Sequence, residues 1–376
     1  MPWVEGLVWG GWLIWLTVLV LPWRPWSIAE RLESAEDDAR GDLRDVVVLV
    51  PARNEANVLA KTLSGLGGQG AGLKLVVVDD QSTDRTADVV RGCGVADLVL
   101  VPGRAIPEGW TGKLWALEQG KDWLDRPLTL LLDADVVLSP GLVVALRRQL
   151  QQQGGGLVSL MVKLPTGTFW QRLLLPPFVY FFKLLYPFRR VNSGASRVAA
   201  AAGGCMLLET HVLGKIGAFY AFRDALIDDC ALARRAKRLG FPTWIGLTRS
   251  ATSERPVGGL RPIWNMVVRT AFTQLQYSIG WLLVCTTLMT MAFVGPVLAM
   301  LSASPWLMGA AVMAFMAMAA SYWPTLRFYA LPPYLALLLP VVGVLYLAMT
   351  WHSAVRFWRG ERSRWKGRVY LRTESL

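Results

Sequence analysis

The sequence predicts an α/β domain built on a mainly parallel sheet, with transmembrane helices at both ends of the chain. Three observations support this prediction. Short apolar segments alternate with helical patterns between residues 45 and 132, and several of them end in polar or acidic residues. Long runs without charged residues lie near both ends of the chain. Alternating strands and helices are typical of a parallel sheet that is covered on both faces.

The first element is an apolar run over residues 6–23, which contains no charged side chain and is long enough to span a bilayer. It lacks a basic start and a small-residue cleavage site, so it predicts a retained anchor over residues 1–24. Glu5 precedes this run, whereas Arg24 and Arg31 follow it. The positive-inside rule then places the amino terminus outside and residues 42–278 in the cytoplasm.

Four apolar segments predict the strands of the central domain. They cover residues 45–50, 73–78, 98–101 and 128–132, and the first is followed by a helix with Val58, Leu59, Leu63 and Leu66 on one face. Polar segments follow three of these strands, at residues 51–55, 79–84 and 133–135. Ligands of parallel sheets bind beyond the carboxyl ends of the strands, so these segments predict one site. Each segment alone also suits a turn.

Asp133 and Asp135 form the most informative of these segments. Side chains two residues apart on a strand point the same way, so both carboxylates are expected to face one cation. Mn²⁺ and Mg²⁺ prefer oxygen ligands, and Mg²⁺ often takes one or two carboxylates plus substrate phosphates. The pair therefore predicts a Mn²⁺ or Mg²⁺ site for a substrate that carries a diphosphate.

The ordered motifs resemble those of family 2 inverting glycosyltransferases. The family motifs are PARNE at 51–55, VDDQSTD at 78–84, GK at 112–113 and DAD at 133–135. Five further segments are similar to the bacterial hopene-associated glycosyltransferases: GWTGKLWA at 109–116, AGGCML at 202–207, LIDDCALA at 226–233, MVVRTAF at 266–272 and WKGRVY at 365–370. This resemblance covers nearly the whole chain.

The resemblance implies a glycosyltransferase A-type, Rossmann-like domain that binds a nucleotide-sugar donor, with a UDP-sugar as the expected donor. Asp80 matches the family residue that contacts the nucleotide base, and Glu55 the residue that borders the nucleoside pocket. The residues expected to bind the donor are Pro51, Arg53, Glu55, Asp79, Asp80, Lys113 and Asp133. For Lys113 the alternative is a solvated surface lysine, because lysine is generally exposed.

Asp228 and Asp229 resemble the acidic pair that supplies the catalytic base, and the place of Asp229 in the motif favours it as the base. The pair opens an amphipathic helix, where carboxylates are favoured by the helix dipole alone. Proximity to Asp228 is expected to raise the pKa of Asp229 toward a useful value. Arg269 occupies the arginine position of a Gln-x-x-Arg-Trp motif whose Gln and Trp are absent here, and could stabilise the leaving diphosphate. Its alternative is a basic residue at the membrane edge.

Residues 169–190 combine apolar bulk with basic residues and predict an interfacial segment that presents a lipid acceptor, against the alternative of a helix packed on the sheet. Three apolar blocks over residues 279–352 predict further spans, and residues 353–376 form a basic tail. Three crossings would leave this tail outside, against its charge, so one block could be re-entrant.

The net charge of +12 is attributed to an anionic membrane rather than to nucleic acid, because no nucleic-acid motif accompanies it. These observations together predict a multi-pass, metal-dependent glycosyltransferase of the bacterial inner membrane that acts on a lipid, with its catalytic domain in the cytoplasm. A hopanoid acceptor follows from the resemblance alone. A polyprenyl phosphate, a carotenoid or a ceramide-type acceptor stays open, as does an inactive membrane scaffold.

Overall fold

An eight-stranded mixed sheet is the centre of the α/β domain in the computed structural model, which describes residues 2–255, 258–365 and 368–371. The spatial order of the strands is β3-β2-β1-β4-β7-β6-β8-β5. Their bounds are β1 Val46–Ala52, β2 Lys74–Asp79, β3 Leu98–Pro102, β4 Leu128–Leu132, β5 Val136–Leu138, β6 Leu157–Lys163, β7 Cys205–Glu209 and β8 Thr243–Ser253.

The four strands expected from the sequence form the parallel half of this sheet. β3, β2, β1 and β4 pair in parallel, and β1 is buried along its whole length because both sheet faces are covered. The other half is mixed: β7 runs antiparallel to β4 and β6, whereas β6 and β8 are parallel. The short β5 joins the edge of the sheet antiparallel to β8.

Helices cover the two faces of the sheet, and alternate residues of β1 face them. Val46, Val48 and Val50 belong to one core cluster, whereas Val47 and Leu49 belong to another. The first cluster includes residues of α2 (Ala56–Gly67), α3 (Thr86–Arg91) and α5 (Leu142–Gln152). The second includes residues of α4 (Gly112–Gly120), α8 (Thr210–Lys215) and α9 (Asp228–Arg238). This layered arrangement is typical of α/β domains.

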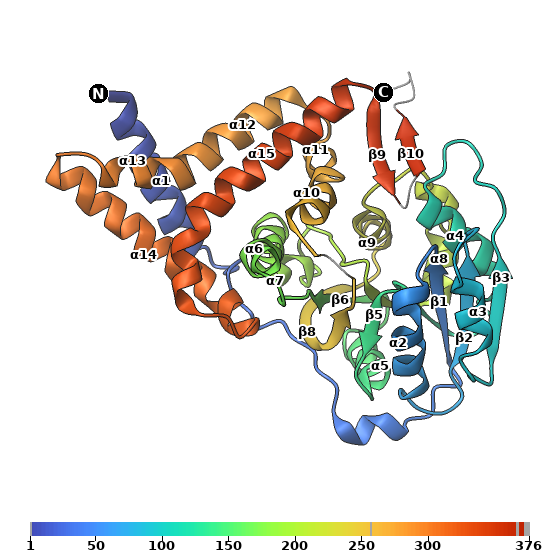
Figure 1. The fold of residues 1–376 in the computed structure, drawn as a ribbon. Coiled ribbons are helices and arrows are strands. Elements are labelled where there is room, and N and C mark those ends of the chain that lie inside the picture. The colour runs from blue at the N-terminus through green and yellow to red at the C-terminus, as the bar shows by residue number, and fades with distance from the viewer. Residues whose placement is uncertain (1, 256–257, 366–367, 372–376) are drawn as a thin grey trace.

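A bundle of apolar helices lies beside the α/β domain, and segments from both ends of the chain contribute to it (Figure 1). It contains α1 Pro2–Val20, α12 Ile279–Met289, the π-helical turn η4 Thr290–Val294, α13 Gly295–Met300, α14 Pro305–Phe328, the 3₁₀ turn η5 Pro333–Leu338 and α15 Leu339–Trp358. Within the described residues, three segments are long and apolar enough to cross a membrane: Ile279–Met300, Pro305–Phe328 and Pro333–Trp358.

The expectation of spanning helices at both ends is therefore met at the carboxyl-terminal end alone. Within the described residues, α1 contributes a shorter apolar helix, Glu5–Val20. The run over residues 6–23 does not remain helical because Pro22 follows, and the residue before a proline is disfavoured in the α conformation. α1 nevertheless packs against α13 and α14, so it belongs to the same bundle.

Four helices connect the bundle with the α/β domain. They are α6 Phe169–Leu185, α7 Phe188–Val191, α10 Leu260–Val268 and α11 Ala271–Gln274. α6 contacts α10, α14 and α15. The hydroxyl of Tyr180 on α6 lies 2.7 Å from that of Ser321, and Tyr346 on α15 donates to the carbonyl of Leu174 at 2.8 Å. One face of α6 is thus packed against the bundle. The alternative interpretation of residues 169–190 was a helix packed on the sheet instead.

The basic residues of this segment were expected to extend to the membrane surface, but Lys183 does not. Its side chain is buried and donates to the carbonyl of Trp26 at 3.3 Å. Arg189 donates to the carbonyl of Pro22, and the guanidinium of Arg190 lies 4.9 Å from the ring centre of Trp23. These basic residues hold the connection that follows α1.

The chain just before the last apolar block and the end of that block both contact the α/β domain or its connecting helices. Just before this block, Arg249 of β8 donates to the carbonyls of Arg327 and Phe328 at the end of α14. At the end of the block, Ser353 of α15 donates to the carbonyl of Val268 at 2.6 Å. The remaining elements are η1 Glu36–Arg40, η2 Lys121–Trp123, η3 Tyr220–Phe222 and the hairpin of β9 Glu361–Trp365 and β10 Arg368–Leu371. Part of the predicted basic tail, residues 366–367 and 372–376, lies outside the described residues.

Candidate active site

The polar segments after β1 and β2 lie side by side, because these strands pair in parallel and Ala52 is opposite Asp79. Arg53 donates from Nη1 to the carbonyl of Asp80 at 2.5 Å and to that of Gln81 at 3.1 Å. Arg53 therefore ties the two strand ends together. The Asp80 side chain is buried at this junction.

Turn chemistry accounts for part of this edge. The Asp79 carboxylate accepts from the backbone N–H of Ser82 at 3.0 Å, and Asn54 accepts from the N–H of Thr83 at 2.8 Å. Pro51 lies inside β1, opposite Val78. Glu55 directly precedes α2, and its backbone N–H donates to the Thr86 hydroxyl. These contacts fix the backbone shape of the edge that the sequence predicts to bind the nucleoside.

Lys113, in the first turn of α4, lies at the centre of an acidic cluster. Its Nζ is 2.8 Å from Asp133 and 3.2 Å from Asp228. Burial alone would lower the pKa of Lys113, but Asp133 and Asp228 outweigh it and raise that pKa above its ordinary value. Lys113 is thus a firmly charged ammonium group between the segment after β4 and the start of α9, which excludes the reading as a solvated surface lysine.

Asp229 is held by two backbone N–H groups. Its Oδ2 accepts from Gly203 at 2.7 Å and its Oδ1 accepts from Cys230 at 2.7 Å. Burial, followed by the charge of Asp228, raises the pKa of Asp229 to about 6, against the opposing effects of Lys113 and the two N–H groups. This carboxyl group can therefore gain and lose a proton near neutral pH, as a general base requires.

Gly203 lies so close to this carboxylate that a side chain would intrude. A Cβ atom at residue 203 would lie 3.1 Å from Asp229 Oδ2 and 3.3 Å from Lys113 Nζ. Both distances are tighter than ordinary contacts of a Cβ atom. The AGGCML motif, which ends in β7, therefore lets the backbone approach and orient Asp229.

The geometry around Asp133 and Asp135 differs from the predicted strand pattern. β4 ends at Leu132, and the N–H of Val136 donates to the carbonyl of Asp133, which closes a turn. Alternation along a strand consequently does not apply to the two carboxylates. The Asp133 side chain is 28% exposed and pairs with Lys113, whereas that of Asp135 is 6% exposed and accepts from Ser253 at 2.6 Å and Arg255 at 3.2 Å.

The two aspartates supply oxygen ligands suited to a divalent cation. No cluster of three or more His, Cys, Asp or Glu side chains able to hold a metal occurs in the described part of the chain. Two carboxylates fit a cation whose other ligands are water and the phosphates of a substrate. Such a cation would compete with Lys113 for Asp133.

Two arginines complete the charged cluster. Arg255, just after β8, pairs with Asp135, and Arg269 follows α10. Burial lowers the pKa of Arg269, the charge of Arg255 lowers it further, and the carboxylates of Asp228, Asp133 and Asp229 oppose both. The buried Nε of Arg269 has no hydrogen-bond partner among the described residues. The guanidinium groups of Arg255 and Arg269 and the ammonium group of Lys113 thus lie among the carboxylates of Asp133, Asp135, Asp228 and Asp229. Such cationic donors are suited to phosphate oxygens.

The family model described as "Glycosyltransferase like family 2" matches residues 44–261, which is more than half of the chain. The chain belongs to this family. The matched segment of this family 2 glycosyltransferase contains Lys113, Asp133, Asp135, Asp228 and Asp229, as well as the edge formed by β1 and β2.

Comparisons with individual proteins agree with this assignment. The 4,4'-diaponeurosporenoate glycosyltransferase of Staphylococcus haemolyticus is 33% identical over 119 residues, 31% of this chain and 32% of the relative. Its counterpart in Staphylococcus aureus is 34% identical over 128 residues, 34% of each chain. The chain thus aligns with about a third of the length of these curated relatives.

The mannosyltransferase PcManGT of Pyrobaculum calidifontis, solved with GDP-Man and Mn²⁺, is similar over 95% of this chain and 100% of its own. The TM-score is 0.59 and the identity 21%, so this likeness shows the fold. The predicted glycosyltransferase A-type fold is confirmed. The likeness extends over the apolar helices, because it covers nearly the whole chain.

The structure brings five of the predicted residues into one cluster: Lys113, Asp133, Asp228, Asp229 and Arg269. Asp135 joins it through Arg255, which the sequence analysis missed. Arg255 lies 120 positions from its partner and in no recognised motif, so no local signal could identify it. The other predicted donor residues, Pro51, Arg53, Glu55, Asp79 and Asp80, lie at the ends of β1 and β2.

Proposed function

We propose that this chain is a membrane-bound inverting glycosyltransferase that transfers a sugar from a nucleotide-sugar donor to a lipid acceptor. The observation that carries the proposal is Asp229, a carboxyl group fixed by two backbone N–H groups beside the Lys113–Asp133 ion pair. Its pKa of about 6 allows it to be ionised at neutral pH and still accept a proton as the reaction proceeds.

In this mechanism Asp229 accepts the proton of the acceptor hydroxyl while the hydroxyl oxygen attacks the anomeric carbon of the donor. The bond to the diphosphate breaks on the opposite face, which inverts the configuration. Lys113, Arg255 and Arg269 offset the negative charge that develops on the leaving diphosphate. Asp80 and Glu55 border the base and nucleoside, at the edge that Arg53 and Asp79 shape.

A divalent cation is part of this proposal. Asp133 and Asp135 would hold it, and it would neutralise charge on the donor diphosphate when bound. The presence of Mn²⁺ with GDP-Man in the structure of PcManGT supports this choice and the nucleotide-sugar donor. The nucleotide of the donor is expected to be UDP from the sequence resemblance.

The acceptor is proposed to be a hopanoid-type lipid, on the strength of the sequence resemblance. The curated relatives favour a second candidate, a carotenoid-type lipid, because they are named for activity on 4,4'-diaponeurosporenoate. The apolar helices packed on α6 and α10 support a lipid acceptor of either kind. An inactive scaffold is disfavoured, because the charged cluster is intact.

The protein is proposed to reside in the bacterial inner membrane with its active site on the cytoplasmic side. The three candidate spans support membrane residence. The contacts just before the last apolar block and at its end support a re-entrant path for it, which would keep the basic tail beside the active site. Labelling of single cysteines in intact cells tests the proposed cytoplasmic location of the active site. An externally applied reagent should reach a cysteine at Pro2 and miss one at Gln152.

Purified full-length protein tests the function directly. It should hydrolyse a nucleotide sugar slowly by itself and transfer the sugar to one acceptor class among a hopanoid polyol, a carotenoid carboxylic acid and a polyprenyl phosphate. A scaffold would do neither with any donor. Product analysis then identifies the acceptor class.

A further inference from the structure

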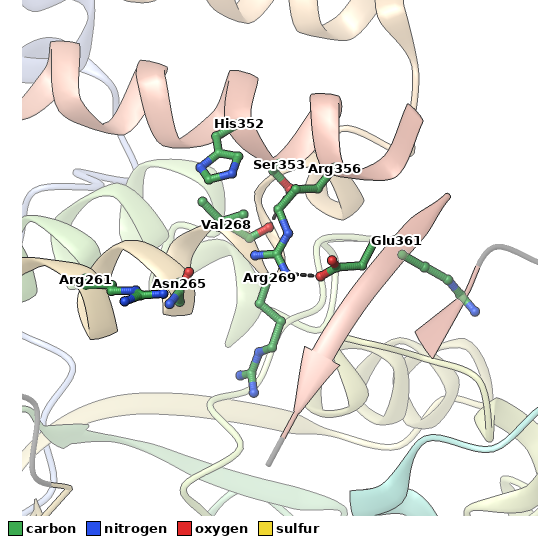
Figure 2. Close-up of a pocket in the computed structure, with 9 residues that line it drawn as sticks. Arg261, Asn265, Val268, Arg269, His352, Ser353, Arg356 and Glu361 are labelled. Atoms are coloured by element: carbon green, nitrogen blue, oxygen red, sulfur yellow. Dashed lines mark hydrogen bonds and ion pairs between the residues drawn. The ribbon is translucent and has the colours of Figure 1, made fainter. Parts of the chain in front are cut away.

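A cavity of about 320 Å³ lies on the bundle side of the active site, between α10, α15 and the start of β9. Arg261, Asn265 and Arg269 line it from α10 and its end, and His352, Ser353 and Arg356 line it from α15 (Figure 2). Glu361 and Arg362 of β9 complete the wall. The cavity therefore lies where the last candidate span meets the α/β domain.

The cavity has more positive than negative charge. Arg356 pairs with Glu361, and Arg362 lies 3.5 Å from Asp224. Arg261 and Arg269 form no ion pair within 4.0 Å with any described residue. The wall thus contains four arginines and one carboxylate, Glu361. The carboxylate of Asp224 lies outside the wall, and those near Arg269 belong to the catalytic cluster, so an anionic ligand would offset the positive charge of Arg261.

Two uncharged hydrogen-bond donors, from His352 and Asn265, also line the cavity. Trp264 donates from Nε1 to Nδ1 of His352 at 2.8 Å, so the proton of a neutral imidazole is on Nε2 and is available as a donor. The Asn265 amide lies one helical turn after Arg261 on α10. By contrast, the Ser353 hydroxyl is already used, since it accepts from Phe272 and donates to Val268.

Arg269 connects the cavity with the catalytic cluster. It lines the cavity, and the charges of Asp133, Asp228 and Asp229 act on it. In Figure 2 its side chain extends from the cavity toward the sheet, away from Arg356. A group held in the cavity would therefore lie next to the site of sugar transfer.

We propose that this cavity binds the phosphate group of a lipid at the membrane surface. The Arg261 guanidinium would hold the phosphate oxygens, with Nε2 of His352 and the Asn265 amide as further donors. Arg269 forms the part of the wall that borders the catalytic cluster. The lipid tail would leave toward the apolar bundle. The phosphate belongs either to an anionic phospholipid of the bilayer or to a phosphorylated acceptor. This proposal rests on the proposed function only in that a lipid reaches this face.

Binding to the full-length protein in phosphatidylcholine nanodiscs tests the proposal, with no nucleotide sugar present. The probes are farnesyl phosphate and its neutral counterpart farnesol. The wild-type protein should bind farnesyl phosphate about 10-fold more tightly or better, since charge-assisted bonds to phosphate are lost with farnesol. Arg261→Gln should abolish this difference and leave farnesol binding unchanged. Arg327→Gln is the matched control, because Arg327 is an exposed arginine at the end of α14 outside the cavity.

A second arm separates the two phosphate sources. If phosphatidylglycerol in the nanodisc displaces farnesyl phosphate, the cavity takes the head group of a bilayer phospholipid; if it does not, the cavity takes the acceptor's own phosphate. Equal binding of both probes, or equal loss in the Arg327→Gln control, would overturn the proposal. Displacement of farnesyl phosphate by UDP or GDP would also overturn it, because the cavity would then belong to the donor. Donor hydrolysis, measured separately, can fail without affecting this result.

Discussion

Replacement of Asp229 by Asn isolates the proposed base while it changes the shape of the site little. Asn keeps one oxygen that can accept from Gly203 or Cys230, but it cannot take a proton from the acceptor. Loss of a general base typically lowers the rate by about 10²–10⁴-fold. Donor binding should persist, because the base acts in the transition state and not in the ground state.

The pH dependence of the wild-type enzyme follows from the same group. With a pKa of about 6, Asp229 becomes protonated below that pH, so kcat/KM should fall as the pH decreases through 6. Asp228→Asn is the informative control. Removal of the neighbouring negative charge lowers the pKa of Asp229, and the acid limb of the profile should move to lower pH.

Stability gives an independent check. The folded-state pKa of Asp229 lies above the ordinary value of 3.8, so this group stabilises the fold at pH below 3.8 and that contribution is lost as the pH rises through 6. The difference between the folded-state pKa of about 6 and the ordinary pKa of 3.8 corresponds to about 3 kcal/mol of stability at most, at 1.36 kcal/mol per unit of pKa. Asp229→Asn should therefore melt at a higher temperature than wild type at pH 8 and lose this advantage near pH 4.

Near-normal turnover in Asp229→Asn together with a crippled Asp228→Asn would refute the assignment of the base.

Three further predictions test other parts of the site and fold. A chelator should abolish sugar transfer and added Mn²⁺ or Mg²⁺ should restore it, whereas Asp135→Ala should stay inactive; full transfer in excess chelator would exclude the metal. Gly203→Ala should reduce kcat roughly 10-fold by displacing the Asp229 carboxylate, whereas Gly214→Ala, with nothing within 4 Å of the new Cβ, should be silent; equal activities would remove Gly203 from the site. Burial lowers the pKa of Lys183 to about 7 from 10.5, so wild-type stability should rise between pH 7 and 10.5, and Lys183→Met should flatten this dependence; an unchanged slope would contradict the burial.

The parallel half of the sheet could be predicted from sequence because its strands carry a local signal. β1, β2 and β4 consist mostly of Val and Leu, and polar residues follow them in the sequence. Burial on both faces of a sheet requires such apolar strands. The antiparallel partners β5 and β7 were not predicted, because short strands at these positions depend on pairing across the sheet rather than on composition.

Long-range contacts account for the errors at the site and in the bundle. The turn at Asp133 forms because its N–H and carbonyl bond to Gly204 and Val136, and a strand pattern does not contain that information. The ion pair of Asp135 with Arg255 and the burial of Lys183 against Trp26 likewise depend on residues far along the chain. A lysine in a basic, apolar segment is expected to extend to the surface, but here the connection after α1 covers it.

The most direct test of lipid glycosylation is the transfer of a radiolabelled sugar from a nucleotide sugar into chloroform-extractable lipid. Wild-type protein and Asp229→Asn would be compared in bacterial membranes that supply the native acceptor. We expect label in a lipid product with the wild-type protein, and a loss of about 10²-fold or more with the variant. Label that stays in the aqueous phase with both proteins, or that enters lipid equally with both, would contradict the proposed lipid glycosyltransferase.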